Sequence, residues 1–403
     1  MAPSIYDSVK EVPEDPILSL ASIFKNDPRS NKIDLTIGVY RDDQGYSLPM
    51  KVVRRAEKVL VEEPHSKVYL PIDGDQDYLN EMGKLVFGLK LYEKIHSSLV
   101  KAQTVGGTSA LYLLSRFFRE TISKAVWISD PTWVNHIGIF ESSKYEINKY
   151  PYYDFSSHSL LFEQILSSID KAKENDIILL HGCCHNPTGH DLDKNQLQQI
   201  LEIVKRKKLI PLFDFAYQGF GVSLDQDAEA IRHFAAEGIP MAVAVSNSKN
   251  FGLYADRIGS LFILTENPKL AKKVLGKIKS LIRVDFSNPP KHGSMIISKI
   301  LNDPILKQDW IDELKSYQKR ISNIRSSFFE KLAAAGLSES FKHLKLTQGM
   351  FCFTGLSPSD VKKIQDERAI FMTGQGRINI TGLNKVNLDI VVDAIASVKK
   401  HHA

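Results

Sequence analysis

The sequence predicts an α/β fold built on a mostly parallel sheet with helices on both faces. From residue 100 to residue 265, short apolar runs alternate with stretches that have helical spacing. The runs are apolar throughout instead of alternating in polarity, which is typical of strands buried on both faces. Helical segments between strands let neighbouring strands run in parallel, so a doubly wound sheet is the expected architecture.

Five of the apolar runs are predicted to be strands of this sheet. They are residues 125–129, 177–181, 209–214, 241–245 and 260–264. Helical segments separate several of them, and those at 192–207 and 228–236 have the three-and-four spacing of amphipathic helices. Ligands of such sheets bind beyond the carboxyl ends of the strands, and polar motifs follow several of these strands. We therefore expect the functional site at that edge.

The segments on both sides of the sheet region have patterns of their own. Residues 12–18 are proline-rich and are expected to form an extended arm. Residues 309–336 carry apolar side chains at three-and-four spacing, which predicts one long amphipathic helix that ends at Gly336. The remaining elements expected from the pattern are helices at 20–24 and 52–60, and strands at 33–40, 350–353 and 377–380.

Length and charge exclude several classes of protein. A chain of 403 residues is long enough for two or three domains. The net charge of +5 is small for this length, so it does not argue for a nucleic-acid partner, although it allows a positive site for anionic substrates. Three cysteines offer neither a disulfide framework nor metal-ligand spacing, and no run approaches the ~18 apolar residues of a membrane span. We expect a cytoplasmic protein with no metal and no membrane partner.

One lysine lies in a polar segment that directly follows the predicted strand 241–245. A lysine at a strand end that is partly desolvated can lose its proton and form a Schiff base with an aldehyde, and Lys249 has this position. Ser246 and Arg257 flank it and could bind a phosphate through a hydroxyl group and a planar guanidinium. Together these residues suggest pyridoxal phosphate. Taken alone, a Ser-x-Ser-Lys segment is more often a solvated loop.

Other polar residues follow strands in the same way, and each has an ordinary alternative. Residues 104–111 contain a glycine turn into a helix, which could bind an anion or be a plain helix start. Trp133 could stack on a heteroaromatic cofactor or belong to the core. Asp214 ends an apolar strand, where a carboxylate needs a cationic partner such as a pyridinium nitrogen. The turn at 181–189 could be a common Asn-Pro loop, and Arg377 could be a surface residue.

In their order along the chain, these segments resemble the aspartate/aromatic aminotransferases, subgroup Iα of the fold-type I pyridoxal-phosphate enzymes. The resemblance covers essentially the whole chain. The motifs that carry it are Asp15-Pro16-Ile17-Leu18, Ile37-Gly38-Val39-Tyr40-Arg41-Asp42, Tyr69-Leu70-Pro71-Ile72, Gly106-Gly107-Thr108, Pro131-Thr132-Trp133, His185-Asn186-Pro187-Thr188-Gly189, Phe213-Asp214-Phe215-Ala216-Tyr217, Ser248-Lys249-Asn250-Phe251-Gly252-Leu253-Tyr254, Ser287-Asn288-Pro289-Pro290 and Gly376-Arg377-Ile378-Asn379.

The resemblance implies a fold-type I aminotransferase fold with two domains and an arm. The large, doubly wound, pyridoxal-phosphate-binding domain is expected at residues 47–317, and the smaller α+β domain is built from both chain ends, 15–46 and 318–403. Residues 1–14 would be the N-terminal arm, and the extended segment from Pro13 to Leu18 would pack on a second copy of the chain. The protein would be a homodimer with shared active sites. The resemblance also implies cis peptide bonds at Asp130-Pro131 and Asn186-Pro187.

Roles in binding pyridoxal phosphate carry over one residue at a time. Lys249 would bind the cofactor covalently and move the substrate proton, and Asp214, supported by His136, would keep the pyridinium nitrogen protonated. Tyr217 would hydrogen-bond the phenolic oxygen, and Lys249, Asp214 and Tyr217 are the expected catalytic residues. The full expected cofactor-binding set is Gly106, Gly107, Thr108, Trp133, Asn186, Asp214, Tyr217, Ser246, Lys249, Arg257 and, from the other subunit, Tyr69.

The resemblance also implies a substrate site. Arg377 would bind the α-carboxylate with help from Gly38, Trp133 and Asn186, while Arg283 would reach across the dimer to a distal carboxylate. A second carboxylate-binding arginine implies transfer of an amino group between L-aspartate and 2-oxoglutarate by a ping-pong cycle. The alternatives are an aromatic amino acid aminotransferase with the same mechanism, a fold-type I decarboxylase or lyase, and a binding protein that has kept the fold.

Four positions depart from the usual pattern of the family. Asn247 stands beside the catalytic lysine where a tyrosine is common, and Asp256 replaces a glutamate. Gly106 lacks the serine hydroxyl that many relatives have in the phosphate loop. These three changes leave the chemistry intact. Val68, beside Tyr69, is apolar where aspartate-selective members often have a polar residue, so the choice between acidic and aromatic substrates stays open.

Overall fold

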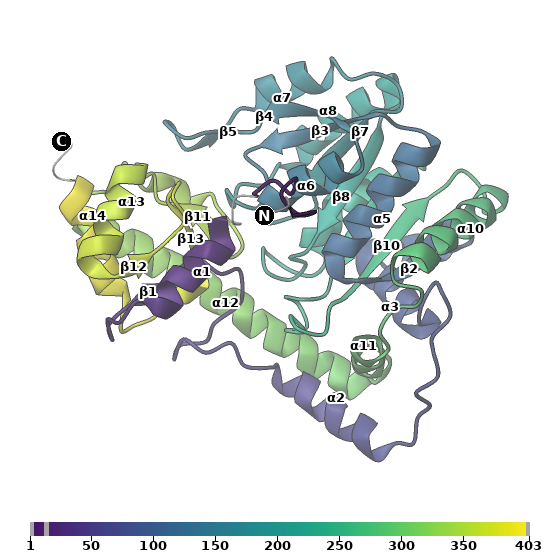
Figure 1. Ribbon diagram of the computed structural model, residues 1–403, viewed down its shortest axis with the longest axis horizontal. Coiled ribbons are helices and arrows are strands. Elements are labelled where there is room, and N and C mark those ends of the chain that lie inside the picture. Colours follow the sequence, from purple (N-terminus) through teal and green to yellow (C-terminus); the bar gives the residue numbers. More distant parts are fainter. Residues whose placement is uncertain (1–3, 12–15, 400–403) are drawn as a thin grey trace.

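A twisted sheet of seven strands forms the centre of the computed structural model, which describes residues 4–11 and 16–399 (Figure 1). Its neighbouring strands, in spatial order, are β2 (Leu99–Val105), β10 (Ile258–Leu264), β9 (Met241–Ser246), β8 (Ile210–Phe215), β7 (Ile177–His181), β3 (Ala125–Asp130) and β4 (Glu146–Pro151). Strand β10 is antiparallel to both of its neighbours, and the other pairs are parallel. The prediction of a mostly parallel sheet is therefore confirmed, and each of the five predicted strands is present.

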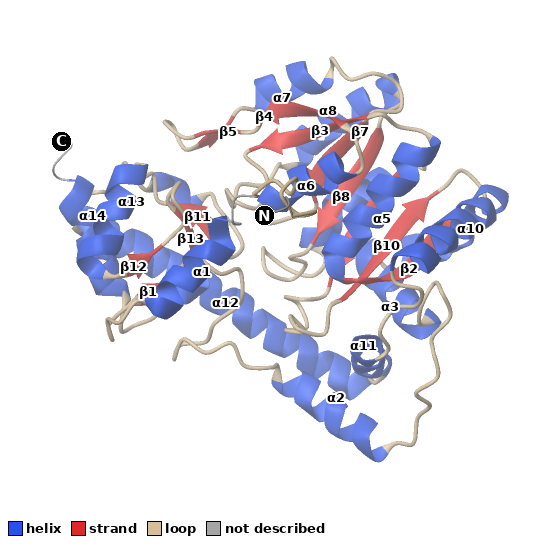
Figure 2. Ribbon diagram, viewed as in Figure 1, coloured by secondary structure: helices blue, strands red, loops and turns tan. Residues whose placement is uncertain are grey.

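Helices cover both faces of this sheet and continue beyond it (Figure 2). Their apolar sides contribute to two clusters of buried residues, one on each face. The helices among the described residues are α1 (Pro16–Asn26), α2 (Lys51–Glu62), α3 (Gln76–Phe87), α4 (Leu89–Ile95), α5 (Gly106–Thr121), α6 (Val134–Ser142), α7 (Phe162–Ile169), α8 (Lys194–Lys207), α9 (Glu229–Ala236), α10 (Pro268–Asp285), α11 (His292–Asn302), α12 (Pro304–Ala334), α13 (Pro358–Arg368) and α14 (Leu388–Lys399), with short 3-10 turns η1 (His96–Ser98), η2 (Gln226–Ala228), η3 (Lys342–Lys345) and η4 (Ile380–Gly382).

Helix α1 lies beside the C-terminal elements of the chain, as the purple and yellow ribbons of Figure 1 show. Strand β1 (Ile33–Asp34) pairs in parallel with β12 (Ile370–Phe371), and β11 (Phe351–Phe353) pairs with β13 (Arg377–Asn379). A third cluster of buried residues joins these short strands to α13, α14 and the end of α12. A hairpin of β5 (Tyr153–Asp154) and β6 (Ser159–Leu160) extends from the large sheet. The proposed domain boundaries at residues 47 and 318 stay a prediction.

Helix α12 connects the two parts of the molecule. It was predicted from residue 309, but it starts at Pro304, where the Asp303 side chain accepts hydrogen bonds from two backbone N–H groups and caps the first turn. Trp310 is buried, donates from Nε1 to the carbonyl oxygen of Asn250 at 2.8 Å, and stacks on Phe251. The helix is therefore fastened to the segment that carries Lys249, while its other end packs on the short strands.

Two predictions for the N-terminal region were wrong in extent. The strand expected at 33–40 is only two residues long, because the carbonyl groups of Ile37 and Val39 accept hydrogen bonds from the side-chain amide of Asn379 instead of from a strand. The extended arm expected at 12–18 is helical from Pro16, which fits the first turn of α1 because proline lacks the N–H that this position leaves unpaired. Residues 12–15 lie outside the described part of the chain.

Three further findings concern the sequence-based expectations. The Asp130-Pro131 and Asn186-Pro187 bonds are cis, as expected. Cys183, Cys184 and Cys352 are free and buried. Within residues 4–11 and 16–399, no helix has both the length and the apolar composition needed to cross a membrane.

Candidate active site

Most of the predicted site residues line one cavity of about 310 Å³ beyond the carboxyl ends of the central strands. Parallel strands end at a common edge, so residues far apart in the sequence converge there. The predicted residues that line it are Gly38, Gly107, Thr108, Trp133, Asn186, Asp214, Tyr217, Ser246, Lys249, Arg257 and Arg377.

Lys249 lies in the turn after β9, and its ammonium group is 4.9 Å from the centre of the Tyr217 ring. Burial lowers the pKa of Lys249, Asp214 raises it, and the positive charge of Arg257 lowers it again. The net result is a pKa below the ordinary value. A lysine with a lowered pKa has more of its amine in the neutral form, which is the form that reacts with an aldehyde.

Asp214 ends β8 and is held by a histidine. Burial acts to raise the pKa of this carboxyl group, but the hydrogen bond with His136 and the electrostatic interactions with His136, His181 and Lys249 hold the pKa below its usual value. His136 Nε2 lies 3.0 Å from Asp214 Oδ2, and its Nδ1 lies 2.8 Å from Thr132 Oγ1. Because an ionised carboxylate only accepts hydrogen bonds, His136 donates from Nε2, and in the neutral form of the ring Nδ1 accepts from Thr132. Asp214 is thus an ionised carboxylate that can pair with a cation in the cavity.

The opposite end of the cavity has the geometry of an anion site. Helix α5 begins at Gly106 and Gly107, and the N–H groups of its first turn are free of helical partners. A Cβ atom on Gly107 would lie 2.8 Å from Ser246 Cβ, and one on Gly106, whose φ is +75°, would lie 2.5 Å from Arg257 Nη2. Both glycines therefore allow the helix to approach Ser246 and the Arg257 guanidinium closely, which suits a phosphate group.

Two buried polar atoms at the third side of the cavity have no hydrogen-bond partner among the described residues. They are Nε of Arg377 and Oδ1 of Asn186. Arg377 is only 6% exposed, donates from Nη2 to the Thr36 carbonyl at 2.7 Å, and lies 4.6 Å from the Phe351 ring. Burial lowers the pKa of this guanidinium. Buried groups that lack partners fit a site whose ligand supplies them, here a carboxylate on Arg377.

Comparison with known proteins gives the same family throughout. The model of the family "Aminotransferase class I and II" matches residues 30–395. An aspartate aminotransferase of Haemophilus influenzae is 41% identical, over 98% of this chain and 100% of the relative. An aromatic-amino-acid aminotransferase of Pseudomonas aeruginosa is 39% identical, over 98% of this chain and 99% of the relative. The solved structure of an aromatic-amino-acid aminotransferase from Burkholderia pseudomallei, covalently bound to pyridoxal phosphate, has a TM-score of 0.95 and 39% identity, with 98% and 100% of the two chains covered.

The chain belongs to the class I and II aminotransferases. It is a transaminase that depends on pyridoxal phosphate, and its fold is that of the fold-type I aminotransferases. The cavity of this aminotransferase fits the cofactor in three independent ways: a lysine with a lowered pKa, an ionised carboxylate and an anion site around α5. The residues that hold the cofactor stay a prediction.

Three predicted residues do not line the cavity of the aminotransferase: Gly106, which directly precedes the lining residue Gly107, and the two exposed residues Tyr69 and Arg283. Tyr69 is 87% exposed, and Arg283 is also exposed, on α10. The guanidinium of Arg283 donates a hydrogen bond to Ser287 Oγ on the same chain. The sequence had assigned both residues to the site of a second subunit, and that assignment also stays a prediction.

The aminotransferase cavity has four lining residues that were not predicted. Ala216, Ser248 and Tyr254 belong to motifs that carried the resemblance, so their positions in those motifs could have identified them. Tyr254 accepts a hydrogen bond from the Tyr40 backbone at 2.8 Å, and burial raises its pKa to about 12. The fourth residue, Phe351, lies in an apolar strand, and no pattern in the sequence distinguished it from a core residue.

Proposed function

We propose that this aminotransferase transfers the amino group between L-aspartate and 2-oxoglutarate, and that it accepts aromatic amino acids as second substrates. The observation that carries the dicarboxylate assignment is Arg283. Its guanidinium is exposed and forms no ion pair within the described part of the chain, so it is available for a distal carboxylate. The relatives support only the coarser conclusion, because they are named both as aspartate and as aromatic-amino-acid aminotransferases.

A second observation favours the aromatic substrates. Val68 is 72% exposed beside Tyr69 and presents an apolar surface to whatever covers this segment. If the segment forms part of a substrate site, burial of an aromatic ring against Val68 contributes about 1.5–3 kcal/mol, which is comparable with a charge-assisted hydrogen bond. Arginine also stacks on aromatic rings, so Arg283 does not exclude them. We therefore propose dual specificity with acidic substrates preferred.

The proposed mechanism begins with orientation of the amino acid. Arg377 binds the α-carboxylate through the Nε donor that now lacks a partner, and Asn186 lies on the same side of the cavity. The low exposure of Arg377 strengthens this pair, because charged hydrogen bonds are stronger away from water. A carboxylate fixed in this way would limit the orientations of the substrate Cα in the cavity that Lys249 also lines.

The proton transfer is assigned to Lys249. When bound, pyridoxal phosphate supplies an aldehyde that binds the amino group and a ring that accepts electrons from the substrate Cα. The Nζ atom of Lys249, with its lowered pKa, would remove the proton from the substrate Cα and deliver it to the cofactor instead of returning it to Cα. Asp214, kept ionised by His136, stabilises a proton on the ring nitrogen. Tyr217, whose pKa is raised by burial, remains a hydrogen-bond donor throughout.

We also infer that two copies of the chain form each complete site. Val68 and Tyr69 are exposed side chains that a second copy could cover. Val284 is exposed as well and directly follows Arg283, the arginine proposed to be shared between the two copies. The three buried free thiols support a reducing compartment, which agrees with the cytoplasmic location expected from the sequence.

The Arg283→Leu variant tests the substrate assignment. Loss of a bidentate, charge-assisted partner should lower kcat/KM for aspartate by about 10²–10⁴-fold, since each of its two bonds contributes about 1.5–3 kcal/mol. The value for phenylalanine should stay nearly constant or rise. Steady-state kinetics with both amino acids make the measurement, and Arg206→Leu, which removes an exposed arginine on α8 outside the site, is the control. Equal losses for both substrates would show that Arg283 supports the fold or the cofactor instead.

A further inference from the structure

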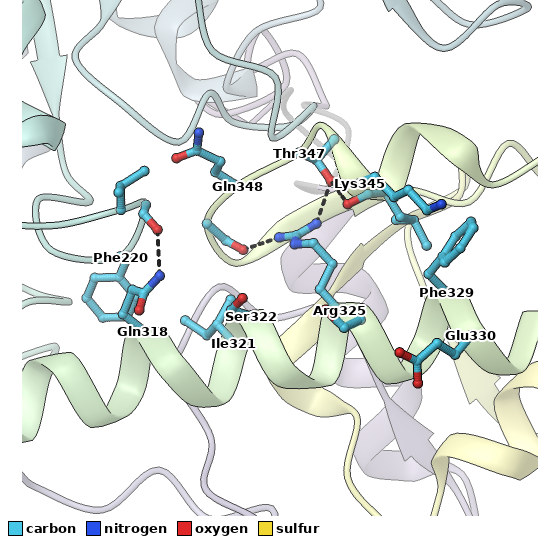
Figure 3. Close-up of a pocket in the computed structure, with 15 residues that line it drawn as sticks. Phe220, Gln318, Ile321, Ser322, Arg325, Phe329, Glu330, Lys345, Thr347 and Gln348 are labelled. Carbon is cyan, nitrogen blue, oxygen red and sulfur yellow. Dashed lines mark hydrogen bonds between the residues drawn. The ribbon is translucent and has the colours of Figure 1, made fainter.

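A second cavity, of about 550 Å³, lies apart from the active site (Figure 3). It is bounded by the C-terminal half of α12, by residues 220–222 after β8, and by residues 344–349 before β11. The two cavities share no lining residue. A ligand in the second cavity would therefore leave the aminotransferase site accessible.

The interior of this cavity contains a guanidinium without an anionic partner. Arg325 extends from α12 and is only 7% exposed. Its Nη1 donates to Thr347 Oγ1 at 2.6 Å and its Nη2 to the carbonyl oxygen of Gly349, and both acceptors are neutral. No carboxylate in the described part of the chain forms an ion pair with it, and burial lowers its pKa. Since a guanidinium has five N–H donors, several remain available.

Two acidic side chains near the cavity do not compensate this charge. Glu330 is exposed, and Figure 3 shows it apart from the guanidinium. Asp227 lies behind Gly221, and its carboxylate accepts hydrogen bonds from the backbone N–H groups of Gly219, Gly221 and Val222. A buried cation is costly without a counter-charge, so the cavity favours an anion.

Neutral donors and an apolar wall complete the cavity. Ser322 and Ser326 lie one turn apart on α12, and Gln348 also lines the cavity; none of the three side chains forms a hydrogen bond within the described residues. Phe329 and Val222 are not fully buried and supply apolar surface to the lining. The cavity thus combines an interior cation, free hydroxyl and amide groups, and an apolar surface, as small-molecule sites do.

We propose that this cavity binds a small organic carboxylate, with the carboxylate on Arg325 and a short apolar or aromatic body against Phe329. The serine hydroxyls and the Gln348 amide would provide the remaining hydrogen bonds. Inorganic phosphate shares the charge but has no body to fill the apolar part, so it should bind more weakly. The site differs from the substrate site in all of its lining residues.

Benzoate binding to the holoenzyme tests the proposal. In the Arg377→Ala variant, where the proposed substrate arginine is removed, calorimetry should still show one saturable benzoate site per chain. Ser326→Phe, which fills the cavity from α12, should abolish this site in the same background. Ser316→Phe, a matched change at an exposed serine of α12 outside the cavity, should retain it. Arg325→Met should weaken binding at least tenfold, and Arg325→Lys should weaken it less.

Three outcomes would overturn the proposal. One is the absence of saturable benzoate binding in Arg377→Ala protein that melts like the wild type. The second is benzoate binding that Ser326→Phe leaves unchanged, and this variant remains informative if Arg325→Met does not fold. The third is phosphate binding as tight as benzoate binding at the same site, which would replace an organic carboxylate by a simple inorganic anion.

Discussion

The amine of Lys249 is subject to three influences on its pKa that do not act in the same direction. Burial and Arg257 lower the pKa, while Asp214 raises it. An arginine cannot fulfil the same role, because its guanidinium stays protonated at any pH that the fold tolerates. Charge at this position is therefore not sufficient for function, and the ability to lose a proton is the property that the site provides.

Lys249→Arg should consequently abolish transamination while the chain stays folded. We expect kcat to fall by at least about 10²–10⁴-fold, the contribution of a positioned proton-transfer group. Steady-state kinetics give the size of the loss. Lys101→Arg is the matched control, since Lys101 is a partly buried lysine in β2, bound to Asn80 and outside the site. Borohydride reduction of the wild type followed by peptide mapping should label Lys249, and a label on another lysine would contradict the assignment.

At the scale of elements, the first turn of helix α5 packs closely against the end of strand β9 at Ser246. The approach depends on Gly107, because a Cβ atom there would lie 2.8 Å from Ser246 Cβ. Gly107→Ala should push the helix start away from Ser246 and Arg257 and weaken cofactor binding by at least tenfold, with the helix content unchanged. Gly276→Ala is the control, since a Cβ on Gly276 in α10 meets no atom within 4 Å and alanine stabilises a helix by about 1 kcal/mol.

Cofactor affinity of both glycine variants can be measured by titrating the apoenzyme with pyridoxal phosphate and following absorbance. Weaker binding in Gly107→Ala alone supports an anion site at the start of α5. Equal affinity in the two variants would mean that the phosphate binds elsewhere.

At the scale of elements, the sequence predicted best what depends on local pattern. The five apolar strands were recognised because each is buried on both faces. Strands β2 and β4 were missed because they contain polar residues, and in β2 the partners of those residues come from distant segments. Lys101 is bound by Asn80, and Gln103 donates to the Pro290 carbonyl at 2.7 Å. Such contacts cannot be read from a local run of sequence.

The candidate site, too, could not be predicted from local sequence pattern alone. Local pattern alone left each of its segments as an ordinary loop, and only the order of motifs along the whole chain connected them. The partner that shortens strand β1, Asn379, is more than 300 residues away in the sequence. Phe351 lies in the cavity for the same reason, because strands from the chain end are placed against the large sheet by tertiary packing.

For the whole molecule, buried histidines make stability depend on pH. Burial lowers the pKa of His190 and His343 to about 4 and that of His181 to about 3. The native chain therefore stays neutral at these positions while the unfolded chain takes up protons near pH 6.5, so stability is full above pH 6.5 and falls as the pH drops below it. Asp191, with its pKa raised to about 6, acts in the opposite direction over part of this range.

Between pH 7.5 and pH 5, each of these histidines should lower the free energy of unfolding by about 2 kcal/mol, while Asp191 restores about 1 kcal/mol. His343→Gln should remove one histidine's share of the loss, because glutamine can still donate to the Phe353 carbonyl that His343 Nε2 contacts. Urea unfolding at both pH values makes the comparison, with exposed His96→Gln as the control. A pH dependence unchanged in His343→Gln would contradict the assignment.

The exposed positions of Tyr69 and Arg283 lead to a prediction about the assembly of two chains. Both are exposed on one chain and outside its cavity, whereas Lys249 and Asp214 lie inside it. If each site takes Arg283 from the partner, a dimer of one Lys249→Ala chain and one Arg283→Ala chain has one intact site. An equal mixture of the two inactive proteins, after subunit exchange, should therefore regain about a quarter of wild-type activity with aspartate, since half of the dimers are mixed.

A mixture of Lys249→Ala with Asp214→Ala should regain none, because both residues belong to the same cavity. Recovery in the second mixture, or its absence in the first once exchange is demonstrated by mass spectrometry, would refute the shared site.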